Sequence, residues 1–281
     1  MTSLKMLIVN ADDYGHCDHV NFAVQEVAMS GLLGGVSILA NGERLAPAIE
    51  FLRDHQEISA GVHLNVVEGM PLAKTSQVRE LLGLDGRFVS KFQTMKRWSL
   101  HPLAVFRAVE IEWRAQIETL LKHGVRLTHA DSHQHLHAFP PAYRCAITLC
   151  KEYGIPAVRC PDETGTRSDR WLQSVALRTS IAVSKASTSG KGLLSNDCFR
   201  GFGRSGGYGL AELTEDLASI PEGLTELAMH PSMSDGVPYP RIAGDRERRA
   251  LLHETFPTLI KELGIQLTTW ETVANGFQPQ A

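Results

Sequence analysis

Short runs of β-branched and apolar residues alternate along this chain with longer segments whose apolar residues recur every three or four positions. The short runs predict β-strands, and we expect seven of them. They lie at residues 7–9, 35–39, 58–64, 125–131, 156–159, 224–230 and 265–269. The periodic segments predict amphipathic helices, of which the clearest covers residues 106–121. Weaker helical patterns cover residues 21–30, 141–153, 210–219 and 246–263.

This alternation of strands and helices predicts an α/β protein whose strands run parallel. Seven strands with six or seven helices favour a distorted, TIM-like (β/α) barrel with helices outside, although an open sheet gives a similar pattern. Two segments, residues 68–101 and 162–208, interrupt the alternation, and we expect them to form long loops over the C-terminal mouth of the barrel. Because no repeat or linker is visible, we expect one domain over residues 1–281.

Composition narrows the class of protein. A hydrophobic fraction of 43% is ordinary for a folded chain, and 28 Lys and Arg against 31 Asp and Glu predict neither nucleic-acid binding nor an anionic membrane partner. The N-terminal apolar run is too short for a secretory signal, and no stretch reaches the roughly 18 apolar residues of an integral membrane segment, so we expect a cytoplasmic protein. The five cysteines lack CxxC spacing, which argues against a disulfide framework and a thiolate zinc site.

Two adjacent carboxylates, Asp12 and Asp13, come directly after the first predicted strand. Paired carboxylates repel each other unless a cation or a shared proton relieves them, so the pair suggests a site. The alternative is a pair of N-cap residues for the following helix, since Asp suits that position. The turn-like sequence at residues 11–15 favours the site.

Histidines are concentrated at the ends of other predicted strands. His63 ends the third strand, and four of the twelve histidines fall within residues 129–137. Because only alternate residues of a strand share a face, we expect His133, nearest the barrel mouth, to be a metal ligand. His135 and His137 are expected to line the pocket or to orient other groups. Two histidines and one carboxylate leave coordination positions open, which is typical of catalytic rather than structural metals.

His230 and Arg159 end two further predicted strands. His230 is a candidate general acid. Arg159 is either the residue that orients Asp12 or an ordinary ion-pairing arginine. The run at residues 201–206 resembles a GxGxxG fingerprint, but no strand leads into it, and the chain has no GxSxG motif. Dinucleotide binding and Ser-His-Asp catalysis are therefore not expected.

Four motifs in order give the chain a family resemblance. They are LIVNADDYG at residues 7–15, GVHLN at 61–65, HADSHQHLH at 129–137 and AMHPS at 228–232. The chain resembles the YdjC-like carbohydrate deacetylases, which include chitooligosaccharide deacetylase and a hopanoid-associated branch. The resemblance implies a distorted β/α barrel, a divalent metal ion and the removal of N-acetyl groups from amino sugars. Residues after Asp162 do not match the chitooligosaccharide branch, which leaves the acceptor sugar open.

The resemblance also implies roles for individual residues. Asp13, His63 and His133 correspond to the metal ligands, and Asp12 is then free to act as the base. Mg²⁺ or Zn²⁺ is expected, with Mn²⁺ or Co²⁺ also compatible with mixed nitrogen and oxygen ligands. The expected partner is a small N-acetylated sugar or a glycolipid, and the sequence is also compatible with a homodimer. The alternatives are another metal-dependent hydrolase, such as a phosphoesterase or amidohydrolase, and a noncatalytic sugar-binding protein.

Overall fold

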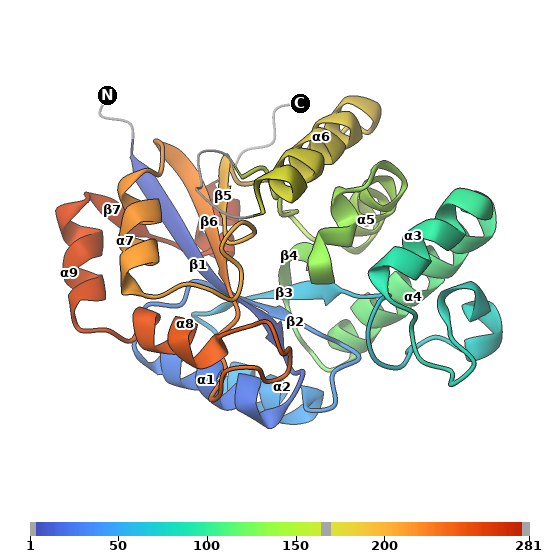
Figure 1. Ribbon diagram of the computed structural model, residues 1–281, viewed down its shortest axis with the longest axis horizontal. Helices are drawn as coiled ribbons and strands as arrows, with labels where there is room; N and C mark the ends of the chain where they lie inside the picture. The colour runs from blue at the N-terminus through green and yellow to red at the C-terminus, as the bar shows by residue number, and fades with distance from the viewer. Residues whose placement is uncertain (1–3, 164–169, 277–281) are drawn as a thin grey trace.

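The computed structural model describes residues 4–163 and 170–276, and its strands form one parallel sheet that curls on itself (Figure 1). Neighbouring strands follow the order β4-β3-β2-β1-β6-β5, and β7 pairs with the first residues of β1. The strands are β1 (Lys5–Tyr14), β2 (Gly35–Ile38), β3 (Ser59–Leu64), β4 (Leu127–Ser132), β5 (Cys198–Arg200), β6 (Gly223–Met229) and β7 (Ile265–Leu267). The expected α/β fold with parallel strands is confirmed.

Single-residue bridges extend the sheet from β4 towards β5. Ala130 bridges to Val158, and Ala157 bridges to Leu194, shortly before β5 begins. The predicted strand at residues 156–159 is thus reduced to two isolated bridges.

Helices cover the outside of the curled sheet, with α3 to α6 gathered on one side and α7 and α9 on the other (Figure 1). They are α1 (Asp18–Met29), α2 (Leu45–Asp54), α3 (Lys91–Leu100), α4 (Pro102–Lys122), α5 (Pro140–Tyr153), α6 (Trp171–Ser187), α7 (Leu210–Ala218), α8 (Gly244–Leu251), α9 (Thr255–Glu262) and α10 (Trp270–Gly276). Within the described chain, no helix combines the length and apolar character needed to cross a bilayer. The pattern over residues 246–263 belongs to two helices rather than one.

The two segments expected to be long loops contain regular structure. Residues 68–101 include two 3₁₀ turns (Thr75–Gln77 and Arg79–Leu81) and α3, and the described part of 162–208 includes α6 and β5; residues 164–169 lie outside the described residues. The prediction of two long loops was wrong because the helices in these segments, α3 and α6, bury only a few residues each. In α3 only Thr94 and Trp98 are buried, which leaves little apolar periodicity in the sequence.

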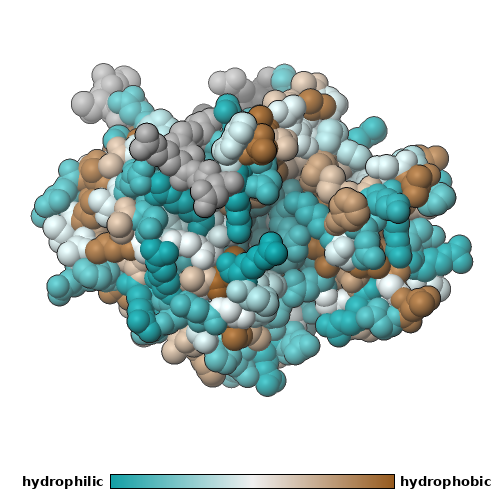
Figure 2. Space-filling model, in the orientation of Figure 1, coloured by the Kyte–Doolittle hydropathy of each residue, from teal (hydrophilic) through white to brown (hydrophobic). Residues whose placement is uncertain are grey.

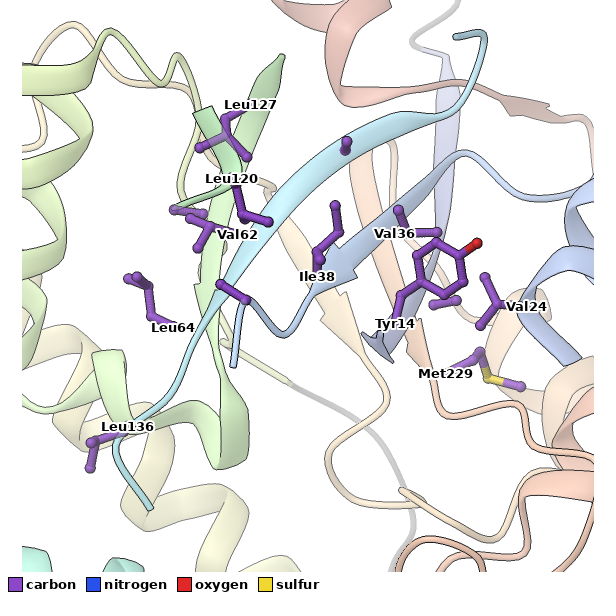
Figure 3. Close-up of a cluster of buried hydrophobic side chains, with 14 of the residues drawn as sticks. Tyr14, Val24, Val36, Ile38, Val62, Leu64, Leu120, Leu127, Leu136 and Met229 are labelled. Carbon is purple, nitrogen blue, oxygen red and sulfur yellow. The ribbon is translucent and has the colours of Figure 1, made fainter. Parts of the chain in front are cut away.

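Each strand near the centre of the sheet has an apolar face, which packs against the helices outside, and a polar face, which points into the curled sheet. Both faces are buried. In β3, Val62 and Leu64 pack in the main core while Gly61 and His63 alternate with them. Figure 3 shows Val62 and Leu64 near Leu120 of α4, with Tyr14, Val24 and Val36 grouped on the other side. The same alternation in the neighbouring strands places polar residues inward; these are Asn10, Asp12, Ser37, His129, Asp131 and Glu226. The concave interior of the sheet is therefore polar although it is buried.

We predict that Gly61→Ala destabilises the protein, because a Cβ at this position would lie 2.3 Å from the His129 imidazole. Overpacking of this kind costs about 1–3 kcal/mol. Gly276→Ala is the matched control, since nothing lies within 4 Å of the Cβ it would add. Urea unfolding of the two variants checks the prediction, and equal stabilities would show that β3 and β4 do not depend on this close approach.

Candidate metal centre

The end of β1 directs two successive carboxylates into one cavity. Neighbouring residues of a regular strand point to opposite faces, but Asp13 has a left-handed backbone with φ 63°, and the pairing of β1 with β2 shifts register between Ala11 and Tyr14. Both Asp12 and Asp13 consequently line a cavity of about 530 Å³. Such a backbone costs roughly 1–3 kcal/mol, and Asp is one of the residues that tolerate it best.

The helix-cap interpretation of this pair is excluded. Helix α1 begins at Asp18, and its N-cap residue is Cys17. Asp12 and Asp13 instead belong to β1, which runs to Tyr14. The two carboxylates therefore have no part in capping the helix.

Three buried side chains, two from strands and one from the residue after a strand, meet in this cavity. Asp13 Oδ1 lies 2.9 Å from His133 Nδ1 and 3.3 Å from His63 Nε2. His63 belongs to β3, and His133 is the first residue after β4. One ligand atom from each of the three lies within 4.8 Å of the others. Parallel strands end at the same edge of a sheet, which is why residues far apart in sequence come together here.

The surroundings of His63 fit a metal ligand. Its Nδ1 donates to Asp131 Oδ1 at 2.7 Å, so its Nε2 faces Asp13. A carboxylate that orients an imidazole in this way is characteristic of metal sites, where it also makes the ligand more basic. Two imidazoles and one carboxylate form a donor set suited to divalent transition metals.

A second group, Asp12, His63 and Asp131, is also close enough to hold a cation. However, Arg159 already lies against both of its carboxylates. The positive charge of that guanidinium opposes a second cation at the same oxygens. We therefore favour Asp13, His63 and His133.

The charges of the cluster are mutually stabilised. Burial alone would raise the pKa of Asp13, but the imidazoles of His133 and His63 hold it well below its usual range. Burial would lower the pKa of His63, but Asp131 and Asp13 raise it to about 10. The site therefore favours positive charge next to these carboxylates.

A fully buried arginine organises the floor of the site. Arg159 donates to both oxygens of Asp12, at 2.8 and 2.7 Å, and to Glu226 Oε1 at 2.9 Å. It also lies 2.6 Å from Asp131 Oδ2. Burial raises the pKa of Glu226 to about 7, against the lowering effect of Arg159. One cation is thus shared by three carboxylates.

Two further histidines of the 129–137 motif, His135 and His137, lie in different surroundings. His135 lines the cavity and lies edge-on to Phe199 and Phe202. His137 is fully buried, with Nε2 3.0 Å from the Arg159 carbonyl and Nδ1 2.6 Å from Ser132 Oγ. Burial lowers its pKa to about 4, so the neutral ring donates to that carbonyl and accepts from Ser132. His137 thereby ties the backbone of Arg159 to the end of β4.

His230 follows the last residue of β6 and lines the same cavity. Its Nδ1 lies 3.8 Å from Glu247 Oε2, and Glu247 also accepts from the backbone amides of His230 (2.6 Å) and Gly206 (2.8 Å). Burial alone would lower the pKa of His230, but Glu247 raises it to about 9. The Glu247 carboxylate thus favours the protonated imidazole.

Several residues that the sequence did not single out complete the site. Glu68 lies between His133 Nε2 (3.1 Å) and His16 Nε2 (3.0 Å), and Tyr239 lies against both rings. A clearer sequence signal existed for Glu226, which is a lone acid in the apolar strand β6. Such a residue is rarely buried without a partner, and Arg159 is that partner.

A family model described as YdjC-like protein matches residues 6–262. The chain belongs to the YdjC-like family. This YdjC-like protein is 30% identical over 241 residues to a carbohydrate deacetylase of Mus musculus, covering 80% of this chain and 77% of that protein. The resemblance drawn from the four motifs is confirmed.

Two further relatives and one solved structure are similar to this chain. A carbohydrate deacetylase of Thermoanaerobacter pseudethanolicus is 26% identical over 273 residues, covering 95% of this chain and 98% of that protein. Another, from Brevibacillus brevis, is 34% identical over 165 residues, which is 58% of this chain and 62% of that protein, or less than two thirds of its length. In fold, the chain is similar to a protein of Enterococcus faecalis V583 described as a cellobiose-phosphate cleavage protein, with TM-score 0.78, 22% identity and coverage of 96% and 99%.

We predict that Arg159→Met lowers the free energy of unfolding by about 3–5 kcal/mol, because it leaves three buried carboxylates without their cation. The control is Arg126→Met, which removes an exposed arginine paired with Glu271 and is expected to cost at most about 1 kcal/mol. Urea unfolding measures both. An Arg159→Met protein as stable as the Arg126→Met protein would contradict the proposed importance of the buried cluster.

Proposed function

We propose that this YdjC-like protein is a metal-dependent carbohydrate N-deacetylase, an amide hydrolase that removes the acetyl group from an N-acetylated amino sugar. One arrangement supports the proposal above all: the Asp13, His63 and His133 cluster opens into the same cavity as Asp12 and His230. A cation site, a carboxylate and a protonated imidazole are what amide hydrolysis requires. The relatives named carbohydrate deacetylase support the choice of substrate class.

Asp13, His63 and His133 would hold one divalent cation, and we propose Mg²⁺ or Zn²⁺, with Mn²⁺ or Co²⁺ as further candidates. When bound there, such an ion lowers the pKa of a water molecule and polarises the acetyl oxygen. His63 is kept in the correct orientation by Asp131, whose oxygen accepts its Nδ1 proton.

Asp12 is the proposed general base. Arg159 and Asn10 donate to its oxygens, Asn10 Nδ2 at 2.8 Å from Oδ1, and so fix the carboxylate at the edge of the cavity. From this position it accepts a proton from the attacking water. Its neighbour Asp13 faces the histidines instead, so the kink in β1 separates the two roles.

His230 is the proposed general acid. Its ring lines the cavity, and Glu247 keeps it protonated, so it can donate to the departing nitrogen of the sugar. Donation at this step prevents expulsion of an unstable amide anion. The Glu247 carboxylate positions His230, because it accepts from the backbone amide of His230 and lies 3.8 Å from the imidazole Nδ1.

Acetate release from a panel of N-acetylated monosaccharides, disaccharides and lipid-linked sugars tests the proposal. We expect release from at least one of these compounds and its loss after treatment with a chelator. Phosphoesters serve as the comparison substrates. Turnover of phosphoesters alone, or sugar binding without turnover when metal is saturating, would overturn the proposed reaction.

We predict that Asp13→Asn and Asp12→Asn have different effects, since the first removes a metal ligand and the second the base. Asp13→Asn, like His63→Ala and His133→Ala, should empty the site, because a neutral amide is a poorer ligand. Asp12→Asn should retain the metal and slow turnover roughly 10²–10⁴-fold, since an amide cannot accept the proton. Metal content and acetate release measured on both variants separate the outcomes. An empty site in Asp12→Asn with a loaded site in Asp13→Asn would show that the roles are reversed.

We predict an alkaline limit to activity set by His230. The general acid must be protonated, so kcat/KM should fall as pH rises through the pKa of about 9. Because Glu247 raises that pKa, Glu247→Gln should move the limit to lower pH. Glu254→Gln changes an exposed glutamate and is the control. A limit that stays in place in Glu247→Gln, while the protein remains folded, would exclude His230 as the acid held by Glu247.

A further inference from the structure

Two segments of the chain are strongly basic although its overall charge is slightly negative. The sequence has 31 Asp and Glu, yet none lies within residues 86–109 or 171–196. These two segments carry eight basic residues: Arg87, Lys91, Lys96, Arg97, Arg107, Arg178, Lys185 and Lys191. Arg178 pairs with Asp162, and Lys91 and Arg97 donate to backbone carbonyls, whereas Lys96, Arg107, Lys185 and Lys191 are exposed. The whole-chain charge of −3, from which no anionic partner is expected, therefore conceals a separation of charge.

The same segments expose large apolar side chains. Phe92 on α3 is 78% exposed, Leu103 at the start of α4 is 76% exposed, and Trp171 at the start of α6 is 61% exposed. Further exposed apolar residues accompany them on these helices; they are Leu100, Leu172, Val175 and Val183. Single exposed apolar residues are normal, but a group interleaved with cations indicates a binding surface.

The two segments lie on one side of the molecule. Helix α3 packs on α4, α4 on α5, and α5 on α6. Lys91, the first residue of α3, and Arg170, which precedes α6, line the same cavity. The exposed aromatic residues Phe92 and Trp171 directly follow these two residues in the sequence. Figure 2 shows brown apolar side chains among teal ones over the area that α3, α5 and α6 occupy in Figure 1, and further brown side chains elsewhere in the same view.

An apolar groove of about 820 Å³ lies on the same side, between α3, α4 and α5. Its walls include Met95 and Trp98 of α3, Leu103 and Phe106 of α4, and Phe139 just before α5. The apolar surface of this side thus continues between the helices rather than ending at their exposed residues.

We propose that this basic apolar face, formed by α3, the start of α4 and α6, binds the surface of an anionic lipid bilayer. The aromatic and aliphatic side chains would enter the boundary between headgroups and acyl chains, and the lysines and arginines would lie among anionic headgroups. Binding of this kind does not depend on the proposed hydrolase activity.

A second copy of this chain is a poorer occupant of the face. A two-fold symmetric contact would bring exposed cations of the two copies, such as Lys96 and Arg107, close to one another, and like charges weaken such a contact. Nucleic acid would use the cations but would leave Leu103, Val175 and Val183 without apolar partners. A lipid surface satisfies both the charge and the apolar side chains.

Sedimentation of the full chain with lipid vesicles tests the proposal. We expect binding to phosphatidylcholine vesicles that contain about one third phosphatidylglycerol, weaker binding at high salt, and little binding to phosphatidylcholine alone. Removing both aromatic residues, in Phe92→Ser with Trp171→Ser, should weaken binding by about tenfold or more. Lys96→Gln and Arg107→Gln should each weaken it roughly fivefold.

Phe22→Ser is the matched control, because Phe22 is a 58% exposed aromatic on α1, which packs against β1 and α8. It should bind vesicles as the unmodified protein does. Circular dichroism verifies that all variants fold. Absence of binding to anionic vesicles, or equal binding by the control and by the Phe92/Trp171 variant, would overturn the proposal. Self-association that the double variant abolishes, without vesicle binding, would also overturn it and assign the face to a second copy.

Discussion

Arg159 is fully buried and lies against three carboxylates, and the other polar groups of the interior are arranged around this contact. Asp131, held on one side by Arg159, accepts the Nδ1 proton of His63 on the other. Asp12 is fixed by the same guanidinium. One arginine cannot neutralise three carboxylates, and the raised pKa of Glu226 relieves part of the excess negative charge. The carboxylates around Arg159 therefore keep some negative charge, which favours an additional cation next to them.

The fold makes this arrangement possible because one face of its central strands is polar and buried. Packing of the outward face stabilises the strands, so the inward face is free to carry hydrogen-bonded polar groups rather than apolar ones. The kink at Asp13 then separates two adjacent carboxylates, one towards Arg159 and one towards the histidines. A straight strand would have directed one of them away from the cavity.

The sequence predicted those features that depend on local pattern. His63 and His133 could be found because each follows an apolar run, and parallel strands bring such ends together. Glu247 could not be found, because its contact with His230 joins α8 to the end of β6. Likewise the kink at Asp13 has no local signal beyond a turn-like sequence.

The missed elements have a similar explanation. Helix α6 buries Leu177, Ile181 and Ser184 on a narrow stripe, so its apolar periodicity is weak. Strand β5 has three residues and is stabilised by pairing with β6 rather than by its own composition. Helices α8 and α9 share one continuous apolar pattern in the sequence, although the helix is interrupted between Leu251 and Thr255. In each case a tertiary contact, absent from the local pattern, decides the structure.

The central claim is that Asp13, His63 and His133, rather than Asp12, His63 and Asp131, hold a divalent cation, because Arg159 already lies against Asp12 and Asp131. The most direct test is anomalous X-ray diffraction from crystals of the protein loaded with Zn²⁺ or Mn²⁺, measured at the absorption edge of the metal. The account predicts an anomalous peak between the side chains of Asp13, His63 and His133. A peak between Asp12, His63 and Asp131, or the absence of any peak in this cavity, would contradict it.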